Sequence, residues 1–419
     1  MTGPSRLQPA NRRGRSSSSV DSSGSRTPIY TKEFAADPHG FYQRMRARHG
    51  ALAPVDLAPG VPATLVVSHR TAVRILGDPV HFPADPRAWQ QKVPAGLPVV
   101  PVMRRRPNAL RTDGSEHERY RAVTVDALAG VDLNSLRTVI ARTAVHLINQ
   151  FCADGAADLI DQYARPLVFH VLDELVGCPP ALADRLTPVL TAIFDMHGDE
   201  DAEATATTVL AELVAAKRAE PGGDLTTRLI EHPARLTDEE LVHQLLAIYQ
   251  AGTESPRNLI ANTVLLILTD PRFTTNHVGF APPTRDALEE VLSADPPLAN
   301  HSIVYPPLPV LIEDVWLPAD QPVLVSPAAC AGDPDRSGAH YPGAGGELAW
   351  GGGPHACPAQ ARSITYLLAE EAVDQLLDAL PDLGPDPVRD EPSWRPGPFH
   401  RALTALPVEF PPTQRMNLP

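Results

Sequence analysis

The longest helical pattern in the chain constrains its fold most strongly. Apolar side chains recur at helical spacing from Leu236 through Leu245 and Ile248 to Leu259 and Leu268. Apolar residues spaced three or four apart face one side of an α-helix. If the pattern is one helix, that helix is over 30 residues and roughly 50 Å long. We therefore expect a helix that crosses the whole molecule.

The rest of the apolar pattern is also mostly helical. Apolar spacing of three or four residues runs almost without a break from Ser115 to about Asp270. Shorter helices are predicted on either side of that region, over residues 41–48, 70–76, 284–292 and 359–380. Short apolar stretches predict strands over residues 63–68, 302–305, 311–316, 322–326 and 403–410. The chain is thus expected to be mainly α with a minor β region.

A single domain is expected after a short tail. Residues 1–28 are rich in serine and of low complexity, so they cannot bury enough apolar surface to fold. Residues 29–419 contain no internal repeat and no second hydrophobic region set apart by a linker. Residues 78–110 hold seven prolines and predict a long irregular loop. Long loops of this kind in compact domains are usually functional.

Charge and cysteine usage exclude several classes of protein. The chain has 36 basic and 50 acidic residues, which gives a formal charge of −14, so a general nucleic-acid or anionic-membrane binder is not expected. No apolar run approaches the roughly 20 residues needed to span a bilayer. Cys152, Cys178, Cys330 and Cys357 are far apart, which argues against a zinc site and a disulfide framework. We expect a reduced, cytoplasmic protein.

The most informative stretch runs from Leu348 to Arg362 and reads LAWGGGPHACPAQAR. Its three glycines let the backbone bend closely, and Cys357 lies just before a predicted helix. Amide groups at the helix start, notably those of Ala359 and Gln360, and the helix dipole favour a thiolate there. Such a thiolate is a nucleophile or a metal ligand. The alternative is a buried, inert cysteine beside a loop.

Residues Trp350 to Ala359 resemble the haem-binding signature of the cytochrome P450 family, aromatic-G-x-G-x-H-x-C-x-G. Trp350 stands for the usual Phe, Gly351 and Gly353 match the glycines, and Ala359 replaces the last Gly. The resemblance implies that Cys357 is the axial thiolate of haem b, iron protoporphyrin IX. The order of elements after residue 30 is also similar to that family, so the resemblance implies its fold, with a long central helix and a cysteine-ligand loop.

Two further histidines fall where the resemblance implies contacts to the haem propionates. His117 and Arg121 resemble the HxxxR motif of the family, which places an imidazole and a guanidinium one helical turn apart. His355 lies two residues before Cys357 and resembles another propionate contact. Taken alone, the segment around His117 is equally well interpreted as a solvated helix start.

The central helix carries Ala251-Gly-Thr-Glu-Ser255, which resembles the AGx(D/E)T motif of the family with Ser255 for Thr. In the family this motif supplies an acid, here Glu254, and a hydroxyl that relay protons to bound oxygen. Gly252 and Pro256 lower helix stability by about 1 and 3 kcal/mol, so the helix is expected to open or kink there. The alternative is a plain proline kink with an exposed Glu254.

The chain departs from the family at the ExxR motif. Glu290 is present, but Ser293 stands where Arg belongs, and residues 286–335 contain no Lys or Arg. The Arg that usually meets a propionate in the next strand is therefore missing too. Several absences in one network indicate a rebuilt proximal side. The stretches 295–300, 349–359 and 394–403 resemble an actinobacterial subset without ExxR, often encoded beside a small GTPase, a roadblock-type protein and a sensor kinase-like protein.

Three functions follow from these features. The leading hypothesis is a monooxygenase that takes electrons from ferredoxin and ferredoxin reductase and inserts one oxygen atom into a small apolar molecule. The second is a haem-binding sensor or scaffold in a regulatory assembly with a small GTPase system, and the third is a structural relative that binds no haem. Substrate-facing regions are expected at 89–110, before Ala251, at 294–306 and at 398–400. Arg104–Arg106 is interpreted as a solvated basic turn or a docking site.

Overall fold

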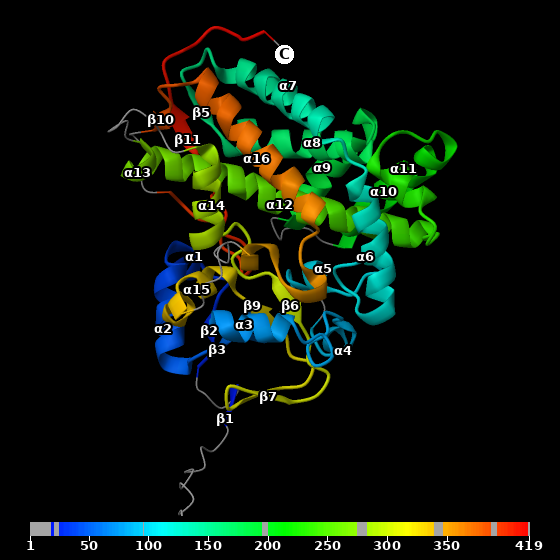
Figure 1. Cartoon of the computed structure of the whole chain (residues 1–419), viewed down its shortest axis with the longest axis vertical. Coiled ribbons are helices and arrows are strands. Elements are labelled where there is room, and N and C mark those ends of the chain that lie inside the picture. The colour runs from blue at the N-terminus through cyan, green and yellow to red at the C-terminus, as the bar shows by residue number, and fades with distance from the viewer. Residues whose placement is uncertain are drawn as a thin grey trace, which may run out of the picture.

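Helices dominate the chain, as the sequence predicts (Figure 1). The computed structural model describes residues 18–20, 25–94, 96–194, 200–274, 283–338, 347–386 and 392–417. Within these residues, the helices are α1 (Lys32–Ala36), α2 (Pro38–His49), α3 (His69–Leu76), α4 (Arg87–Gln90), α5 (Val100–Met103), α6 (Gly114–Ala129), α7 (Leu133–Phe151), α8 (Arg165–Val176), α9 (Pro180–Phe194), α10 (Glu200–Ala219), α11 (Leu225–Glu231), α12 (Asp238–Thr269), α13 (Pro271–Thr274), α14 (Thr284–Ala294), α15 (Pro327–Ala331) and α16 (Ala359–Ala379).

The strands form three small sheets. They are β1 (Ser18–Ser19), β2 (Thr27–Pro28), β3 (Leu52–Asp56), β4 (Pro62–Val66), β5 (Ala156–Asp158), β6 (Ser302–Val304), β7 (Val310–Ile312), β8 (Val315–Leu317), β9 (Val323–Val325), β10 (Gly384–Pro385) and β11 (Pro407–Glu409). The largest sheet has the order β2-β3-β4-β9-β6, and the other two are β1-β8-β7 and β10-β11-β5. The fold class predicted from sequence, mainly α with a minor β region, is confirmed.

Helix α12 is the predicted long helix, with 32 residues. Thr237 and Glu240 form a capping box at its start, where each side chain accepts a hydrogen bond from the other residue's backbone N–H. Acidic residues fill the first turn, and negative charge there stabilises the positive end of the helix dipole. The helix continues through Pro256, although proline removes one backbone hydrogen bond. Helices α8, α10, α14 and α16 pack against α12, so it lies at the centre of the helical region (Figure 1).

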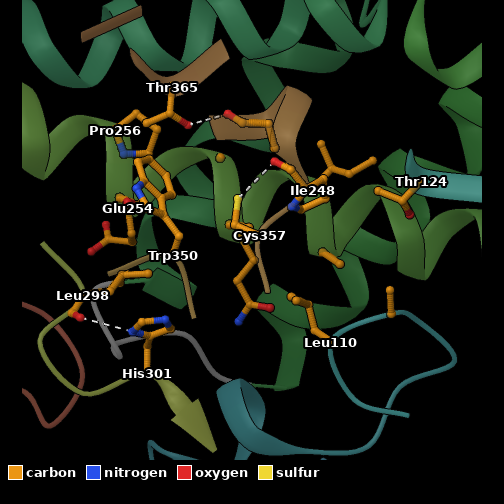
Figure 2. A pocket seen from close by; sticks show the side chains of 18 of the residues that line it. Leu110, Thr124, Ile248, Glu254, Pro256, Leu298, His301, Trp350, Cys357 and Thr365 are labelled. Atoms are coloured by element: carbon orange, nitrogen blue, oxygen red, sulfur yellow. Dashed lines mark hydrogen bonds between the residues drawn. The ribbon is translucent and has the colours of Figure 1, made fainter. Parts of the chain in front are cut away.

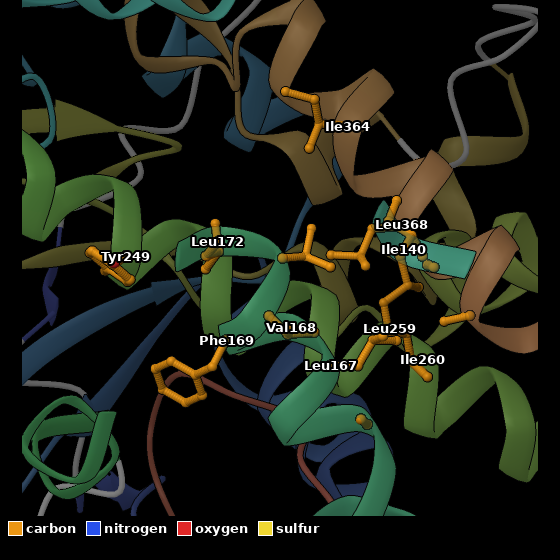
Figure 3. Close-up of a cluster of buried hydrophobic side chains, with 14 of the residues drawn as sticks. Ile140, Leu167, Val168, Phe169, Leu172, Tyr249, Leu259, Ile260, Ile364 and Leu368 are labelled. Carbon is orange, nitrogen blue, oxygen red and sulfur yellow. The ribbon is translucent and has the colours of Figure 1, made fainter. Parts of the chain in front are cut away.

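The buried side chains form one large cluster among the helices and two smaller ones around the five-stranded sheet. In the helical cluster, Leu167 and Val168 of α8, Leu259 and Ile260 of α12 and Leu368 of α16 lie together (Figure 3). The sheet clusters include Leu65 of β4 and Leu324 of β9, whose strands pair side by side. The sheet region therefore depends on strands from both ends of the chain.

Three local predictions need correction. Thr27–Pro28 pairs with Val55 and Asp56 of β3, and Ser18–Ser19 pairs with β8, so these residues of the expected tail take part in sheets because their backbones meet free strand edges. The single strand predicted over 311–316 is a hairpin, β7 and β8, because Glu313 and Asp314 adopt positive φ angles of 49° and 61° and turn the chain.

The third correction concerns the proline-rich loop over 78–110, which contains two one-turn helices, α4 and α5. Part of the loop before Cys357, residues 339–346, lies outside the described residues. Among the residues that the structure describes, no helix is both long and apolar enough to cross a membrane.

Candidate active site

A largely apolar cavity of about 360 Å³ lies between α6, α8, α12 and the start of α16 (Figure 2). All four regions that the sequence analysis expected to face a substrate contribute to its lining. They supply Leu110 from the proline-rich loop, Ile248 from α12, Leu298 from the segment after α14 and Phe399 from the C-terminal turn. Helix α8 adds Leu172, which the sequence analysis did not identify. The cavity therefore collects residues from the whole length of the chain.

The loop before α16 brings Cys357 into the cavity wall. The amide of Cys357 donates a hydrogen bond to the carbonyl of Trp350 at 2.7 Å, which closes the loop. Gly351 and Gly353 have φ angles of +74° and +62°, a region that favours glycine. A Cβ atom on Gly353 would lie 1.9 Å from the backbone oxygen of Leu76, so glycine is required for the loop to lie against α3.

The expected thiolate environment needs correction. Burial raises the pKa of the Cys357 thiol, and the nearby Arg362 and Arg121 only partly offset this effect. The contact of Sγ is with the carbonyl oxygen of Pro358 at 3.8 Å rather than with the amides of Ala359 and Gln360 (Figure 2). Among the described residues, neither amide donates a hydrogen bond to the sulfur, contrary to the expectation from the sequence. A bound metal ion deprotonates a coordinating thiol directly, so coordination does not need a preformed thiolate.

Cys357 does not belong to a cluster of metal-ligating side chains among the residues that the structure describes. In the described ranges no group of three or more His, Cys, Asp and Glu side chains could hold a metal ion. A metal bound by Cys357 would therefore have to bring its other ligands with it, as a macrocyclic cofactor does. Trp350 lies beside the cysteine in the wall, and its buried ring packs against Tyr366 at a centroid distance of 5.4 Å.

His117 of α6 and His355 of the cysteine loop form a stacked pair. Their ring centroids are 4.0 Å apart, and the Nε2 atom of each ring is buried without a hydrogen-bond partner among the described residues. Burial, and secondly the charge of His355, lowers the pKa of His117 to about 4. His355 Nε2 lies 3.9 Å from Asp113, beyond hydrogen-bond distance. An unpaired buried polar atom costs about 1–3 kcal/mol, so both nitrogens fit a ligand that brings its own polar groups.

Arg121 completes this polar corner. Its guanidinium donates to the carbonyl of Ala356, next to Cys357, at 2.5 Å, and its side chain also lines the cavity. The structure thus brings together His117, Arg121, His355 and Cys357, which are up to 240 positions apart in the sequence. Two imidazoles and a guanidinium at one rim of an apolar cavity fit the carboxylates of a flat apolar ligand. The residues present therefore fit a haem.

The opposite wall is formed by α12. Ala251, Gly252, Glu254 and Ser255 all line the cavity. A Cβ atom on Gly252 would lie 2.9 Å from Leu172 Cδ2, so the glycine lets α8 pack closely against α12. This part of α12 therefore combines a small residue, an acid and a hydroxyl at the cavity surface.

Glu254 is buried, with 8% of its surface exposed, so the alternative of an exposed glutamate is wrong. Arg257 and Arg395 each bind its carboxylate at 2.5 Å, and Asn258 Nδ2 lies 3.5 Å away. Burial raises the pKa of Glu254 in spite of these partners. Sequence spacing could have identified Arg257, which is one helical turn away. Nothing in the sequence pairs Glu254 with Arg395, which comes from the C-terminal turn.

Neither residue of the altered ExxR motif lines the cavity. Glu290 binds Arg272 of α13 at 3.0 Å near the surface, and the Ser293 hydroxyl donates to the carbonyl of Glu290. Arg285 instead connects α14 to α16, because it stacks on the Tyr366 ring at 3.6 Å and pairs with Glu370 at 3.4 Å. Arg285 thus connects α14 to α16, and the rebuilt proximal side stays a prediction.

The interpretation of Arg104–Arg106 as a solvated basic turn is wrong, and their use as a docking site stays a prediction. Arg104 and Arg106 bind Glu203 of α10, and Arg105 binds Glu116 of α6 at 2.5 Å. The Arg106 side chain is only 6% exposed. These arginines connect the proline-rich loop to two helices, so they do not form a freely solvated turn.

Comparisons with known proteins agree with this geometry. Cytochrome P450 107B1 of Saccharopolyspora erythraea is 31% identical over 397 residues, which cover 90% of this chain and 95% of that protein. The cytochrome P450 monooxygenase PikC of Streptomyces venezuelae is 30% identical over 399 residues, with 90% and 92% covered.

Structural comparison gives the same result. The solved structure of testosterone-bound CYP154C4 from a Streptomyces species has a TM-score of 0.82 at 28% identity, and the match covers 92% of this chain and 98% of that one. No protein-family model matches the chain. The identity and coverage of the relatives, together with the shared fold, show that the chain belongs to the cytochrome P450 family of monooxygenases, which are oxidoreductases.

Proposed function

We propose that the protein is a haem-thiolate monooxygenase that inserts one atom of dioxygen into a small apolar molecule. Membership of the family implies a haem cofactor, and we propose haem b with Cys357 as its axial ligand. One observation carries this proposal: Cys357, Glu254 and Ser255 all line the same cavity. A thiolate-bound haem supplies the redox chemistry that side chains lack.

The proximal residues hold the cofactor in this proposal. His117, Arg121 and His355 would bind the propionates, since a carboxylate gives the two unpaired Nε2 atoms the partners that the protein does not provide. Trp350, with the backbone of Gly351 and Gly353, would form the surface against which the flat ring packs. Replacing water with fixed donors there lowers the free energy of the bound carboxylates.

The residues of α12 would supply protons and leave space for the substrate in this proposal. Glu254 and the Ser255 hydroxyl would carry the two protons that must reach the oxygen atom released as water. Burial raises the pKa of Glu254, which brings the carboxyl closer to holding a proton at neutral pH. Ala251 and Gly252 leave open space beside them because they have little or no side chain. Low polarity around these groups excludes bulk water, and the apolar lining supports an apolar substrate.

Two electrons must come from outside the chain, and we propose ferredoxin and ferredoxin reductase as the donors. The balance is then one substrate C–H bond and one dioxygen converted, with two electrons and two protons, to an alcohol and water. Because the overall charge is −14, net charge alone does not identify the electron donor. Docking of the donor would depend on the local charge of the surface where it binds.

The test of the haem-thiolate site is the absorption spectrum of the purified protein, ferric and then reduced under carbon monoxide. We expect a red-shifted thiolate-type carbonyl band in the wild type and in Cys178→Ala, because Cys178 does not line the cavity. Cys357→Ala should lose that band. A spectrum without haem, or with the band of a neutral-ligand haem, would overturn the proposal.

A second candidate is a haem-binding sensor or scaffold that acts in a regulatory assembly with a small GTPase system. Two features favour it: the absence of the ExxR arginine, and the ion pairs that Glu254 makes with Arg257 and Arg395. Ser255→Ala discriminates between the two candidates. A monooxygenase should lose coupling between electron consumption and product, whereas a sensor should keep both its haem spectrum and its ligand affinity.

A further inference from the structure

His301 is a half-buried histidine of the cavity wall that the mechanism above does not use. It lies between α14 and β6, and it is the only residue from Asp286 to Asp335 that can carry a positive charge. Its side chain lines the cavity together with Leu298 and Ile303 on either side of it. An isolated polar ring between apolar neighbours in a cavity points to a contact with the ligand.

The segment around His301 is held firmly in place. Asn300 is 1% exposed and donates through Nδ2 to the carbonyl of Pro398 at 2.8 Å, and its backbone N–H donates to Phe399 at 3.1 Å. The Tyr42 hydroxyl donates to Asn300 Oδ1 at 3.2 Å. The next residue, Ser302, is paired with Val325 of β9. The imidazole is therefore presented from a rigid support, which is what recognition of a specific group requires.

Hydrogen bonding fixes which ring nitrogen carries the proton. Nδ1 of His301 lies 3.2 Å from the carbonyl oxygen of Leu298, and a carbonyl only accepts, so Nδ1 is the donor (Figure 2). Burial lowers the pKa of His301 to about 4, so the ring is neutral at pH 7. Nε2 then has a free lone pair on the edge of the ring that faces the pocket (Figure 2). Within the described parts of the chain, no group bonds to Nε2.

Three other polar side chains of the cavity are bound by groups of the protein. Gln244 donates to the carbonyl of Tyr120 and accepts from the amide of Ala109, both at 3.3 Å. Arg111 donates to the carbonyl of Val102 at 2.8 Å. Glu254 is occupied by its arginines. His301 Nε2, like the Nε2 atoms of His355 and His400 in the same lining, has no partner among the described residues, so it remains available to a ligand.

We propose that His301 is a specificity-determining residue whose Nε2 accepts a hydrogen bond from a hydroxyl or N–H group of the substrate. The inference rests on the proposed function and narrows its substrate class to largely apolar molecules that carry such a donor. A lone pair repels a carboxylate and offers nothing to a plain hydrocarbon, so neither class gains from His301.

The test compares two rigid probes of similar shape, 1-adamantanol and 1-methoxyadamantane. Both have an oxygen on the same apolar cage, but only the alcohol has a donor. Titration calorimetry on the full-length, haem-loaded chain gives each dissociation constant. The wild type should bind the alcohol roughly 5–10-fold more tightly, the range that one net hydrogen bond supplies.

Two variants separate the two ring nitrogens. In His301→Asn the amide N–H₂ can still donate to Leu298, but no acceptor replaces Nε2. In His301→Gln an amide oxygen can take the place of Nε2. We expect the preference for the alcohol to fall below about twofold in His301→Asn and to remain, at least in part, in His301→Gln.

Several results would overturn the assignment. The first is a wild type that binds both probes equally or binds neither of them. The second is a His301→Asn protein that still prefers the alcohol. A third is faster haem loss from His301→Asn, which would mean that the ring contacts a haem carboxylate rather than substrate. Failure of the proposed function looks different, because it removes the thiolate-type carbonyl band from the wild type, whereas calorimetry reads probe binding without relying on that band.

Discussion

The two walls of the cavity differ in how their buried polar side chains are paired. On the cysteine side, the Nε2 atoms of His117 and His355 are buried without partners among the described residues, and burial raises the pKa of the Cys357 thiol. On the α12 side, Glu254 is bound by Arg257 and Arg395. The cysteine side thus leaves ring nitrogens without partners, whereas the α12 side holds its buried carboxylate between two arginines. Changes on the cysteine side should therefore alter ligand retention, whereas changes on the α12 side should alter the free energy of unfolding.

The largest effect on folding is expected from Arg257→Leu. Arg257 is 3% exposed, and its removal leaves a buried carboxylate with one partner fewer. We expect the free energy of unfolding to fall by about 3 kcal/mol, because breaking a buried pair from one side typically costs 3–5 kcal/mol and Arg395 remains. Urea unfolding of the ligand-free chain measures this change.

The control for that prediction is the double variant with Glu254→Gln added. It should recover part of the loss, because the unpaired charge is gone. If the changes in unfolding free energy of the two substitutions are simply additive, Glu254 and Arg257 are not energetically coupled. The contrast between the two walls would then be wrong for the α12 side.

The next largest effect is expected from Gly353→Ala on the cysteine side. The new Cβ atom would lie 1.9 Å from the backbone of Leu76 at a φ of +62°, so the loop has to move. We expect a loss of about 2–3 kcal/mol of stability and a weaker thiolate-type band. Gly252→Ala is the matched control on α12, where the obstacle is the flexible end of Leu172 and a helical Ala gains about 1 kcal/mol. Equal losses of stability at Gly353 and Gly252 would contradict the conclusion that the cysteine loop requires glycine at position 353.

The third prediction concerns ligand retention. His117→Phe keeps a ring to stack on His355 but removes one unpaired Nε2. Stability of the ligand-free chain at pH 7 should change by less than about 1 kcal/mol, whereas haem transfer to apomyoglobin should become roughly tenfold faster. His170→Phe, at an exposed position of α8, serves as the control. Unchanged haem release from His117→Phe would remove this histidine from the site.

The same variant has a pH signature. Burial lowers the pKa of His117 to about 4 in the folded chain from an ordinary value of 6.5. Between these values the unfolded chain takes up a proton that the folded chain does not, so the ligand-free protein loses stability as the pH falls. His117→Phe should make this loss shallower between pH 6.5 and 4, which urea midpoints at several pH values would show.

Much of the architecture could be predicted from the sequence because its signals are local. The apolar spacing of Leu236 to Leu268 predicted α12, and the glycines around Cys357 predicted a tight loop before α16. The corner of His117, Arg121 and His355 came from the resemblance rather than from spacing alone. The structure places Arg121 and His355 in the cavity wall and stacks His117 on His355, and the roles of these residues toward a cofactor remain predictions.

The parts that the sequence did not reveal depend on contacts between distant residues. Arg395 is 141 positions from Glu254, and no local pattern connects them. The environment of Cys357 was misjudged because burial, which depends on the whole fold, outweighs the local helix start. Arg104 and Arg106 look like solvated charge in sequence, but Glu203 of α10 lies within reach of both.

The pairing of β4 with β9 has a consequence for how the chain is made. Thr64 lies beside Val323, so the strands that meet in the five-stranded sheet are separated by about 260 residues. The β3–β4 hairpin can form early, but the free edge of β4 has no partner until β9 has left the ribosome. At roughly 5–20 residues per second that interval lasts tens of seconds. During synthesis the sheet region therefore exposes an unpaired strand edge, and a nascent chain that is slowed or truncated before β9 is left with a template for aggregation.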